Sequence, residues 1–527
     1  MEATDDILVE IDDLYVNFYT YQGVVQAIQG VDLVIRKGET LGLVGETGCG
    51  KSVTASTIMK LVLSPPGKIE AGSIYFMEPP EVRAARKAYE AKAQEWWNSL
   101  SKEQKARMMV THGMRFTGFK KRVKPLSPAE AKKITIPDKV PSKIAAMYMA
   151  DMAKKLPRTD RTVQDALRKT YDLVPKSNEY MQKIRGKWIS MIFQEPTTAL
   201  NPVFTAGDQI AEVILLHRRA EMASRALKRV KAELGAAAGK GRPRRVRAKK
   251  GKLKCSHCGS EVKKDAQWCS SCGRQFHGPV SWFFKRMAAK TTLTMLERIV
   301  KKPDAPEFYL GKIPVVNQYK KEMYREALRE ATNMLRTVRI PDPEGVASRY
   351  PHELSGGMQQ RVMIAIALAC NPKLLIADEP TTALDVTIQG QILKLMRDLK
   401  AEFGSSILLI THNLGVVAEM CDRVGVMYAG DMAEVAPARI IFKSPLHPYT
   451  SGLMKAVPSV QMDAKELYSI RGSVPNLIRP PPGCRFHPRC DYAREYCKRV
   501  KPELIEIEPD HFVSCHMVAK AEGYVHG

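Results

Sequence analysis

The sequence predicts an α/β fold built around a phosphate-binding loop, and two observations lead to that prediction. An apolar segment at residues 40–44 runs directly into the glycine-rich phrase GETGCGKS at residues 45–52, and a strand that feeds such a phrase is the setting of a P-loop. A second apolar segment, residues 374–377, ends in the carboxylates Asp378 and Glu379. Continuous apolar runs of this length are typical of buried strands.

The remaining elements of the core follow from apolar periodicity. Residues 7–16 and 31–35 contain alternating or continuous apolar residues, as strands do, and residues 53–63 continue the phosphate loop as a helix. The strands expected in chain order are residues 7–16, 31–35, 40–44, 72–76, 374–377, 406–410, 424–428 and 432–435.

Each part of the phosphate loop has a chemical task. Its glycines let backbone N–H groups surround the β- and γ-phosphates of a nucleotide, Lys51 adds a positive charge there, and the Ser52 hydroxyl can ligate Mg²⁺. The loop by itself predicts binding of ATP or GTP. The residues expected to line the nucleotide are Gly45, Glu46, Thr47, Gly48, Cys49, Gly50, Lys51 and Ser52.

A second phrase narrows the class of protein. LSGGMQQR at residues 354–361 precedes the strand that ends in Asp378 and Glu379. This order of motifs resembles the ATP-binding cassette (ABC) family, and residues 194–196 and 200–214 resemble its oligopeptide and dipeptide importer branch. The resemblance implies an ABC-type P-loop ATPase core, with a RecA-like sheet, an antiparallel β subdomain and a helical subdomain.

The same resemblance implies roles for five further positions. Asp378 matches the carboxylate that holds Mg²⁺, and Glu379 matches the general base that activates the attacking water. Gln194 matches the glutamine that touches Mg²⁺ and water and reports the nucleotide state to a transmembrane partner. His412 matches the histidine that senses the γ-phosphate, and Asp385 matches the loop that communicates across a cassette dimer.

Two more nucleotide contacts are implied, one of them across a dimer. Phe18 fits best as the aromatic side chain that stacks on adenine, with Tyr15 and Tyr19 as close rivals. In the family the signature segment contacts ATP held by the other subunit, so a chain with one cassette needs a second ABC ATPase subunit. The residues expected to reach that ATP are Ser355, Gly357 and Gln360.

The length of 527 residues exceeds what one cassette with its C-terminal extension requires. Two insertions account for the excess, the first of them mainly helical, with stretches such as 80–105 and 128–155 and a modest core of its own. The expected organisation is cassette at 1–76, the first insertion at 77–186, cassette at 187–217, the second insertion at 218–320, cassette at 321–455, and a C-terminal region at 456–527.

The formal net charge of +26 is concentrated rather than spread. Residues 218–254 contain 15 Lys or Arg and only two acids. We expect this basic tract either to lie near anionic lipid headgroups or an acidic partner, or to be a solvated flexible linker. The cassette motifs lie in segments of ordinary charge, which argues against a nucleic-acid partner.

The second insertion also carries a predicted zinc site. Two CxxC knuckles separated by ten residues place four thiolates around one tetrahedral centre, as in a small zinc ribbon. A mononuclear iron site is the alternative. The expected ligands are Cys255, Cys258, Cys269 and Cys272.

A second group of four cysteines lies near the C-terminus, at Cys484, Cys490, Cys497 and Cys515. Their spacing alone leaves zinc, an iron–sulfur cluster and unligated thiols open. The segment 472–515 resembles the C-terminal region of peptide-importer ATPases, which implies that these cysteines hold a [4Fe–4S] cluster with a structural or redox-sensing role.

The function implied by the resemblance is ATP hydrolysis that powers peptide import through a membrane ABC transporter. Its expected partners are a second ABC ATPase chain, two transmembrane permease subunits and an extracytoplasmic solute-binding protein. No apolar run approaches the roughly 20 residues that span a bilayer, and the start of the chain does not resemble a secretory signal, so we expect a peripheral location on the cytoplasmic face of the membrane.

Two alternative functions remain open at this point. Sugar or nickel import uses similar ATPases, which never touch the transported solute. A nucleic-acid-linked ABC ATPase of repair or translation is disfavoured, because the chain has one cassette and neither insertion shows sustained heptads. Asn413 replaces the aspartate that usually follows the switch histidine, and we expect this to tune activity rather than abolish it.

Overall fold

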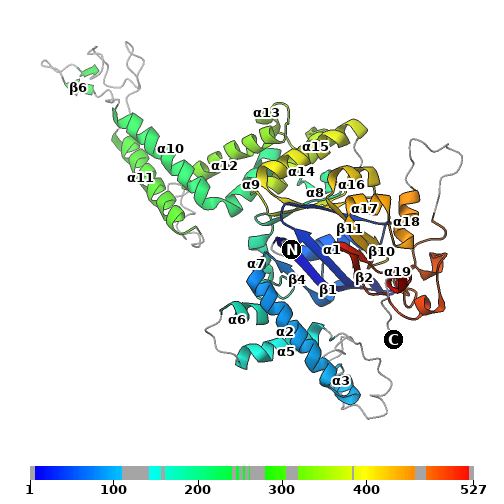
Figure 1. The fold of residues 1–527 in the computed structure, drawn as a ribbon. Coiled ribbons are helices and arrows are strands. Elements are labelled where there is room, and N and C mark those ends of the chain that lie inside the picture. The colour runs from blue at the N-terminus through cyan, green and yellow to red at the C-terminus, as the bar shows by residue number, and fades with distance from the viewer. Residues whose placement is uncertain are drawn as a thin grey trace. The chain divides into compact units, whose positions relative to one another are not determined.

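The computed structural model forms two compact units, Met1–Glu195 with Asn371–Gly527, and Pro196–Cys370 (Figure 1). We call them the first and the second unit. The structure describes residues 6–109, 140, 142–155, 161–239, 245–247, 253–255, 260, 279–303, 318–382, 385–456 and 470–521.

The first unit is built on an eight-stranded mixed sheet whose order is β12-β13-β11-β10-β3-β9-β8-β5. Five neighbouring strands, from β10 to β5, are parallel, and the other three pair antiparallel at one edge. The bounds are β3 (Thr40–Val44), β5 (Ile189–Ile192), β8 (Leu374–Asp378), β9 (Ser406–Ile410), β10 (Arg423–Tyr428), β11 (Asp431–Pro437), β12 (Ile505–Glu508) and β13 (His511–Val513).

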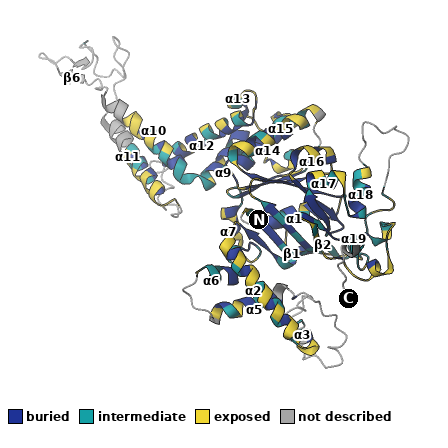
Figure 2. Cartoon of the chain, viewed as in Figure 1, coloured by how far each residue is buried: buried dark blue, intermediate teal, exposed yellow. Residues whose placement is uncertain are grey.

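A separate antiparallel sheet has the order β2-β1-β4, with β1 (Ile7–Thr20), β2 (Gly23–Arg36) and β4 (Gly67–Phe76). Apolar side chains of both sheets form one core, in which Leu14 and Leu33 meet Leu43 and Ile376. Figure 2 shows the strands of this unit as largely buried. The expected α/β core is therefore confirmed, and the strands expected at 7–16 and 31–35 extend into a long hairpin.

Helices and short 3₁₀ turns complete the cassette part of the first unit. The helix expected at 53–63 begins earlier and ends earlier, because Lys51 already belongs to it and Lys60 has a positive φ of 52°. The bounds are α1 (Lys51–Ile58), α15 (Val386–Phe403), α16 (Leu414–Met420), α17 (Ala438–Lys443), α18 (Pro448–Lys455), η4 (His487–Arg489), η5 (Glu495–Lys498) and α19 (His516–Ala521).

The described part of the first proposed insertion is mainly helical. It contains α2 (Pro80–Ser99), α3 (Lys102–Met108), α5 (Ser142–Lys155) and α6 (Arg161–Leu167). Its own small core forms around Trp97, as expected. The single helix expected at 80–105 is interrupted, because the Ser101 side chain forms a capping box with Gln104 and starts a new helix. Of the stretch 128–155, only residue 140 and the part from Ser142 onward belong to the described residues.

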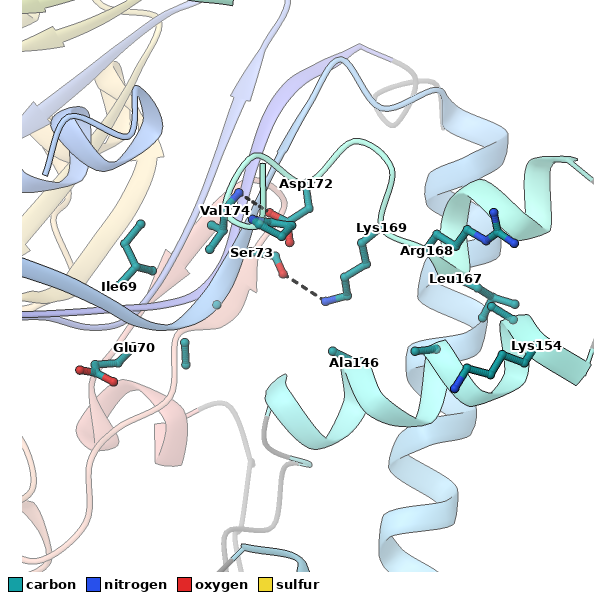
Figure 3. A pocket seen from close by; sticks show the side chains of 15 residues that line it. Ile69, Glu70, Ser73, Ala146, Lys154, Leu167, Arg168, Lys169, Asp172 and Val174 are labelled. Carbon is teal, nitrogen blue, oxygen red and sulfur yellow. Dashed lines mark hydrogen bonds between the residues drawn. The ribbon is translucent and has the colours of Figure 1, made fainter. Parts of the chain in front are cut away.

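The last part of the segment expected to be the first insertion packs into the core of the cassette. Leu173, Met181 and Ile184 lie in the core of the cassette, and α7 (Asn178–Ile184) therefore belongs to it. A cavity of about 830 Å³ lies where the insertion meets β4, and Figure 3 shows Lys169 reaching into it to donate to Ser73. We therefore propose a boundary of this insertion near residue 170 instead of residue 186.

The described part of the second unit is mainly helical, and its strands β6 (Arg245–Arg247) and β7 (Leu253–Cys255) pair antiparallel. Apolar side chains of α10, α11 and α12 form one cluster. The bounds are α8 (Pro196–Ala199), α9 (Ala206–His217), α10 (Arg219–Gly239), α11 (Pro279–Lys301), α12 (Gln318–Thr337), α13 (Pro343–Ala347), η3 (Pro351–Glu353) and α14 (Gly356–Leu368).

The basic tract is not a flexible linker in its first part. Residues 219–239 form α10, and its arginines pair with glutamates of α12. The expectation of a solvated linker is therefore wrong for this part, because acids about 100 positions later in the chain neutralise charges that looked unpaired locally.

The zinc-site cysteines Cys258, Cys269 and Cys272 lie outside the described residues, and Cys255 is described only as the last residue of β7. In the part of the chain that the structure describes, no helix is both long enough and apolar enough to cross a membrane.

Candidate active site

The phosphate loop connects β3 to α1 and is shaped by three glycines with positive φ. Gly48 and Gly50 have φ values of 82° and 104°. Gly45 has a φ of 147°, and a Cβ atom there would lie 2.1 Å from the carbonyl oxygen of Met427. No other residue type fits this position without moving the backbone, so the loop requires glycine there.

The Lys51 side chain folds back over the loop that precedes it. Its ammonium donates to the carbonyl oxygens of Gly45, at 2.8 Å, and Glu46, at 3.1 Å. The Cys49 side chain is buried, and its sulfur lies 3.6 Å from the Lys51 nitrogen. Cys49 therefore contributes its backbone to the loop surface, and its thiol packs underneath.

Ser52 and Asp378 meet at the end of β8, where the predicted Mg²⁺ site lies. The Ser52 hydroxyl donates to Asp378 Oδ1 at 3.1 Å. Burial, and then the negative charge of Glu379, raise the pKa of Asp378, while Ser52 and Lys51 act against this rise. These two oxygens are the ligand type that Mg²⁺ prefers, and a bound cation would favour the ionised carboxylate.

Glu379 lies at the centre of the predicted catalytic group. Gln194 donates to Glu379 Oε2 at 2.8 Å, and Nδ1 of His412 lies 3.3 Å from Oε1. Thr382, which sequence reasoning missed, donates to Oε2 at 3.0 Å. The structure thus brings Gln194, Glu379 and His412 together, although they come from three separate strand ends.

The backbone at Glu379 explains how this carboxylate is aimed. Its φ is 48°, an uncommon value for a residue other than glycine, and its N–H donates to the carbonyl oxygen of Ile410 at 2.8 Å. Ile410 ends the neighbouring strand β9, two residues before His412. The hydrogen bond between these strand ends therefore fixes both side chains on one edge of the sheet.

Asn413 performs the local task that an aspartate would perform. Its side-chain oxygen accepts hydrogen bonds from the N–H groups of Gly415, at 3.0 Å, and Val416, at 3.3 Å, and so caps α16. Asparagine is as good a helix cap as aspartate. Asp385, the predicted communication residue, is exposed at the start of α15, and its side chain makes no capping hydrogen bond.

The aromatic residues near the first hairpin differ in their surroundings. Phe18 is half-buried and packs against the cassette core, and the Tyr19 hydroxyl donates to Glu70 at 2.7 Å. Tyr15 is half-buried too. Tyr21, in the turn between β1 and β2, is fully exposed. Tyr21 was not among the residues singled out from the sequence. Its position between two predicted strands could have indicated an exposed aromatic side chain.

The signature segment begins α14 in the second unit. Ser355 is the exposed N-cap residue of this helix, and its side chain makes no capping hydrogen bond. Gly356 is exposed and Gly357 is half-buried. Gln360, in contrast, is only 1% exposed. Its burial favours a packing role for Gln360 and leaves the helix start as the accessible part of the motif.

The C-terminal cysteines converge on one place. All four thiols are free of disulfides and line a single small cavity in the first unit. Burial, followed by the neighbouring thiols, raises the pKa of Cys484 to about 12. Among the described residues, no group of three or more His, Cys, Asp or Glu side chains has the arrangement of a metal-ion site. The four cysteines thus lie together as expected, but their side chains do not have the arrangement of a single-ion site.

The phosphate loop also receives contacts that sequence reasoning missed. Arg489, next to Cys490, forms an ion pair with Glu46 at 2.9 Å. The Tyr449 hydroxyl accepts a hydrogen bond from the Glu46 N–H at 3.0 Å. Glu46 is therefore held by the C-terminal region through both its side chain and its backbone.

Comparisons with known proteins agree with this geometry. The family described as ABC transporter matches residues 28–169 and 172–382, which together are more than half of the chain. The chain belongs to the ABC transporter family. Residues 433–497 also match the family described as oligopeptide/dipeptide transporter, C-terminal region.

Curated ABC relatives align over nearly the whole chain. The oligopeptide transport ATP-binding protein AppD of Bacillus subtilis is 33% identical over 510 residues, 97% of this chain and 96% of its own length. The dipeptide transport ATP-binding protein DppD of the same species is 31% identical over 508 residues, with 96% and 94% coverage. A probable peptide ABC transporter ATP-binding protein, y4tR of Sinorhizobium fredii, is 31% identical over 511 residues, with 97% and 95% coverage. This chain is an ABC ATPase of the branch that contains these peptide transporter subunits.

Proposed function

We propose that this chain hydrolyses ATP to power the import of di- or oligopeptides through a membrane ABC transporter. The observation that carries the proposal is the group of Gln194, Glu379 and His412 beside the Ser52 hydroxyl and Asp378. In-line attack of water on a γ-phosphate needs a general base, groups that orient the base and the water, and a Mg²⁺ site beside a phosphate loop. The predicted residues supply each of these.

Each residue has a distinct part in this reaction. Lys51 and the loop N–H groups would hold the β- and γ-phosphates, and Ser52 and Asp378 would hold Mg²⁺, which would supply charge stabilisation to those phosphates. Glu379 takes a proton from the attacking water, while Gln194 and His412 orient it. Gln194 and His412 contact Glu379 directly, which places both side chains beside the carboxylate that takes the proton.

The helix start at Ser355 supports a two-cassette mechanism. Its exposed hydroxyl and N–H groups form a surface for the phosphates of ATP held by a second cassette. Closure of two cassettes around two ATP molecules would move two permease subunits, and hydrolysis would reopen the pair. We propose Tyr21 as a fourth candidate for the adenine stack, beside Phe18, Tyr15 and Tyr19, because its ring is free to stack.

Two substitutions test the catalytic assignment separately. Lys51→Ala removes the charge on the phosphates, and ATP binding should be lost. Glu379→Gln keeps the shape but removes the base, and we expect ATP binding to survive while turnover falls by at least about 100-fold. The measurement is ATP affinity and phosphate release with the partner chain present. Normal phosphate release by Glu379→Gln would show that another group is the base.

The substrate class and partners rest on the relatives. Peptide transporter subunits align over nearly the full chain, and the C-terminal match is to the oligopeptide/dipeptide type. Permease subunits and a solute-binding protein are implied by that role, and a peripheral place on the cytoplasmic face of the membrane follows from docking on permeases. Uptake of labelled dipeptide, sugar and nickel by cells with and without this gene distinguishes the three cargo classes.

The four C-terminal cysteines fit a [4Fe–4S] cluster in donor number and chemistry. Cys484, Cys490, Cys497 and Cys515 would each supply one thiolate from the wall of the same cavity. When bound, the cluster would cross-link the C-terminal segment. We also propose zinc at Cys255, Cys258, Cys269 and Cys272, on the spacing of the two knuckles.

Metal analysis tests both centres together. Protein purified without oxygen should contain about one zinc and about four irons with acid-labile sulfide. Replacing Cys255 and Cys258 should remove only the zinc, and replacing Cys490 and Cys497 should remove only the iron. Two zinc ions with no sulfide would show that the cluster assignment is wrong.

A further inference from the structure

The phosphate loop of this chain carries an acid beside the place where a triphosphate binds. Glu46 follows Gly45 directly, and its side chain is 27% exposed. Its carboxylate would repel the negative charges of ATP unless a cation neutralised it. Among the described residues, the ion pair of this carboxylate is with Arg489, whose Nη1 lies 2.9 Å and 3.1 Å from the two carboxylate oxygens.

Arg489 is held in place on all sides, so its position is specific. Its side chain is only 7% exposed. Nε donates to the carbonyl oxygen of Arg471 at 2.8 Å, Nη2 donates to that of Ile470 at 3.3 Å, and Nη1 also reaches the Tyr428 hydroxyl at 3.3 Å. A side chain with this many fixed donors acts as part of the scaffold rather than as a mobile surface charge.

The segment that carries Arg489 is a short loop between two of the four cysteines, residues 484–490. It folds on itself, because the His487 N–H donates to the Cys484 carbonyl oxygen at 3.0 Å and the Cys490 N–H donates to that of His487 at 3.3 Å. Whatever holds the thiols of Cys484 and Cys490 therefore fixes both ends of the loop. We call residues 484–490 the clamp loop.

The clamp loop touches the phosphate-loop side of the sheet at two more points. Phe486 packs against Tyr428 and against Tyr449, with ring centres 5.1 Å and 5.4 Å apart. The Tyr449 hydroxyl in turn accepts a hydrogen bond from the Glu46 N–H. Arg485 donates to the carbonyl oxygen of Ala429, directly before Gly430, whose N–H donates to the carbonyl oxygen of Cys49 at 2.9 Å.

We propose that Arg489 is a positioning residue that couples the four-cysteine site to the phosphate loop, so that ATP affinity depends on whether that site is occupied. Through its ion pair it neutralises Glu46 and keeps the loop open to phosphate. An occupied four-cysteine site fixes both ends of the clamp loop, and loss of the occupant would loosen the loop and weaken the ion pair between Arg489 and Glu46. The coupling rests on the cluster proposed above, whereas the ion pair does not.

Four forms of the full chain test the ion pair, with Mg–ATP as the titrant in calorimetry. Arg489→Met should weaken ATP binding about tenfold, which corresponds to about 1.4 kcal/mol. Glu46→Gln should bind ATP at least as well as the parent, because it removes the repelling charge. The double variant should recover most of the loss, and Arg489→Lys should lie between Arg489→Met and the parent.

The ATP affinities of these variants distinguish two roles of Arg489, neutralisation of the Glu46 charge and mechanical support of the phosphate loop. If Arg489 only braced the loop, Glu46→Gln would lose as much affinity as Arg489→Met, and the double variant would not recover. That pattern would overturn the role of Arg489. So would an Arg489→Met variant that binds ATP as tightly as the parent and unfolds at the same temperature.

The coupling is tested by removing iron from anaerobically purified parent and Arg489→Met with an oxidant and a chelator. The parent should lose about as much ATP affinity as the substitution causes, and Arg489→Met should lose little more. Equal affinity of the iron-loaded and iron-free parent would overturn the coupling. A chain that contains no iron and no sulfide as purified overturns the cluster and with it the coupling, while the four-form titration still decides the ion pair.

Discussion

The two proposed insertions contact neighbouring parts of the chain through arginines that differ in burial. In the first insertion, Arg86 of α2 is 1% exposed and bonds to Glu10 of β1 and to Glu78, at 2.7 Å and 2.9 Å, while it stacks 3.7 Å from the centre of the Tyr75 ring. In the second insertion, Arg229 of α10 is 18% exposed and pairs with glutamates of α12. One attachment is an internal ionic cluster, and the other is a partly solvated ladder.

The difference shows how the environment sets the energetic weight of the same kind of contact. Removing Arg86 leaves Glu78, which is 2% exposed, where water cannot rehydrate it, whereas Arg229 and its partner Glu322 are each 18% exposed and Glu322 can be partly rehydrated. The first insertion should therefore depend strongly on Arg86. The second should tolerate the loss of any one arginine and fail only when several are removed.

The largest effect is expected for Arg86→Met. It removes the nearest cation from the buried carboxylates of Glu10 and Glu78, which keep longer contacts with Arg83, at 3.4 Å and 3.8 Å, and we expect a loss of about 3–5 kcal/mol in the free energy of unfolding. Chemical unfolding followed by tryptophan fluorescence measures it, because Trp97 is fully buried in the core of the insertion. Lys87→Met is the matched control, since Lys87 also reaches Glu10 but is 58% exposed. Equal losses in both variants would contradict the distinction between buried and solvated attachment.

A smaller effect is expected for Arg229→Met. Its guanidinium bonds to Glu322 and Glu326 while partly exposed, and we expect a loss of about 1–2 kcal/mol. The loss should shrink in about 1 M salt, where charges are screened within about 3 Å, whereas that of Arg86→Met should persist. Unfolding curves at low and high salt give the comparison. A loss for Arg229→Met that does not change with salt would show that its ion pairs behave like the buried ones of Arg86.

Arg225→Met should cost less again. Its side chain is 43% exposed and pairs with Glu221 and Glu330, so we expect less than about 1 kcal/mol. The double variant with Arg229→Met should lose more than the sum of the two single losses, because Arg225 and Arg229 join the same two helices. Strict additivity in the unfolding measurement would show that the ladder is a set of independent pairs.

The smallest effect on the enzyme is expected from the distal part of the basic tract. Neutralising Arg242, Arg244, Arg245, Arg247, Lys249 and Lys250 together should leave ATP turnover in detergent nearly unchanged. Binding of the chain to anionic vesicles should fall in a salt-sensitive way, by roughly 1 kcal/mol for each charge near the surface. Equal vesicle binding by variant and parent would favour a linker role for this part. Salt-sensitive DNA binding that the variant loses would revive the nucleic-acid alternative.

The candidate catalytic site could be located from the sequence because each of its residues ends or follows a recognisable local element. Asp378 and Glu379 follow a continuous apolar run, and His412 follows another, so their meeting at one sheet edge required only that the two strands be neighbours. Gln360 shows the limit of this reasoning. Its position in the signature motif suggested contact with ATP, but its burial depends on helices that the motif does not contain.

By itself, the sequence determined the phosphate loop, the carboxylate pair, the signature helix and the family, because these are local patterns that strand and helix periodicity make readable. Only the tertiary structure decided which charges are paired. Arg489 lies 443 residues from Glu46, and Arg229 lies 97 residues from Glu326. No local pattern contains such pairs, because the chain path that brings their side chains together is set by packing of the core rather than by the charges.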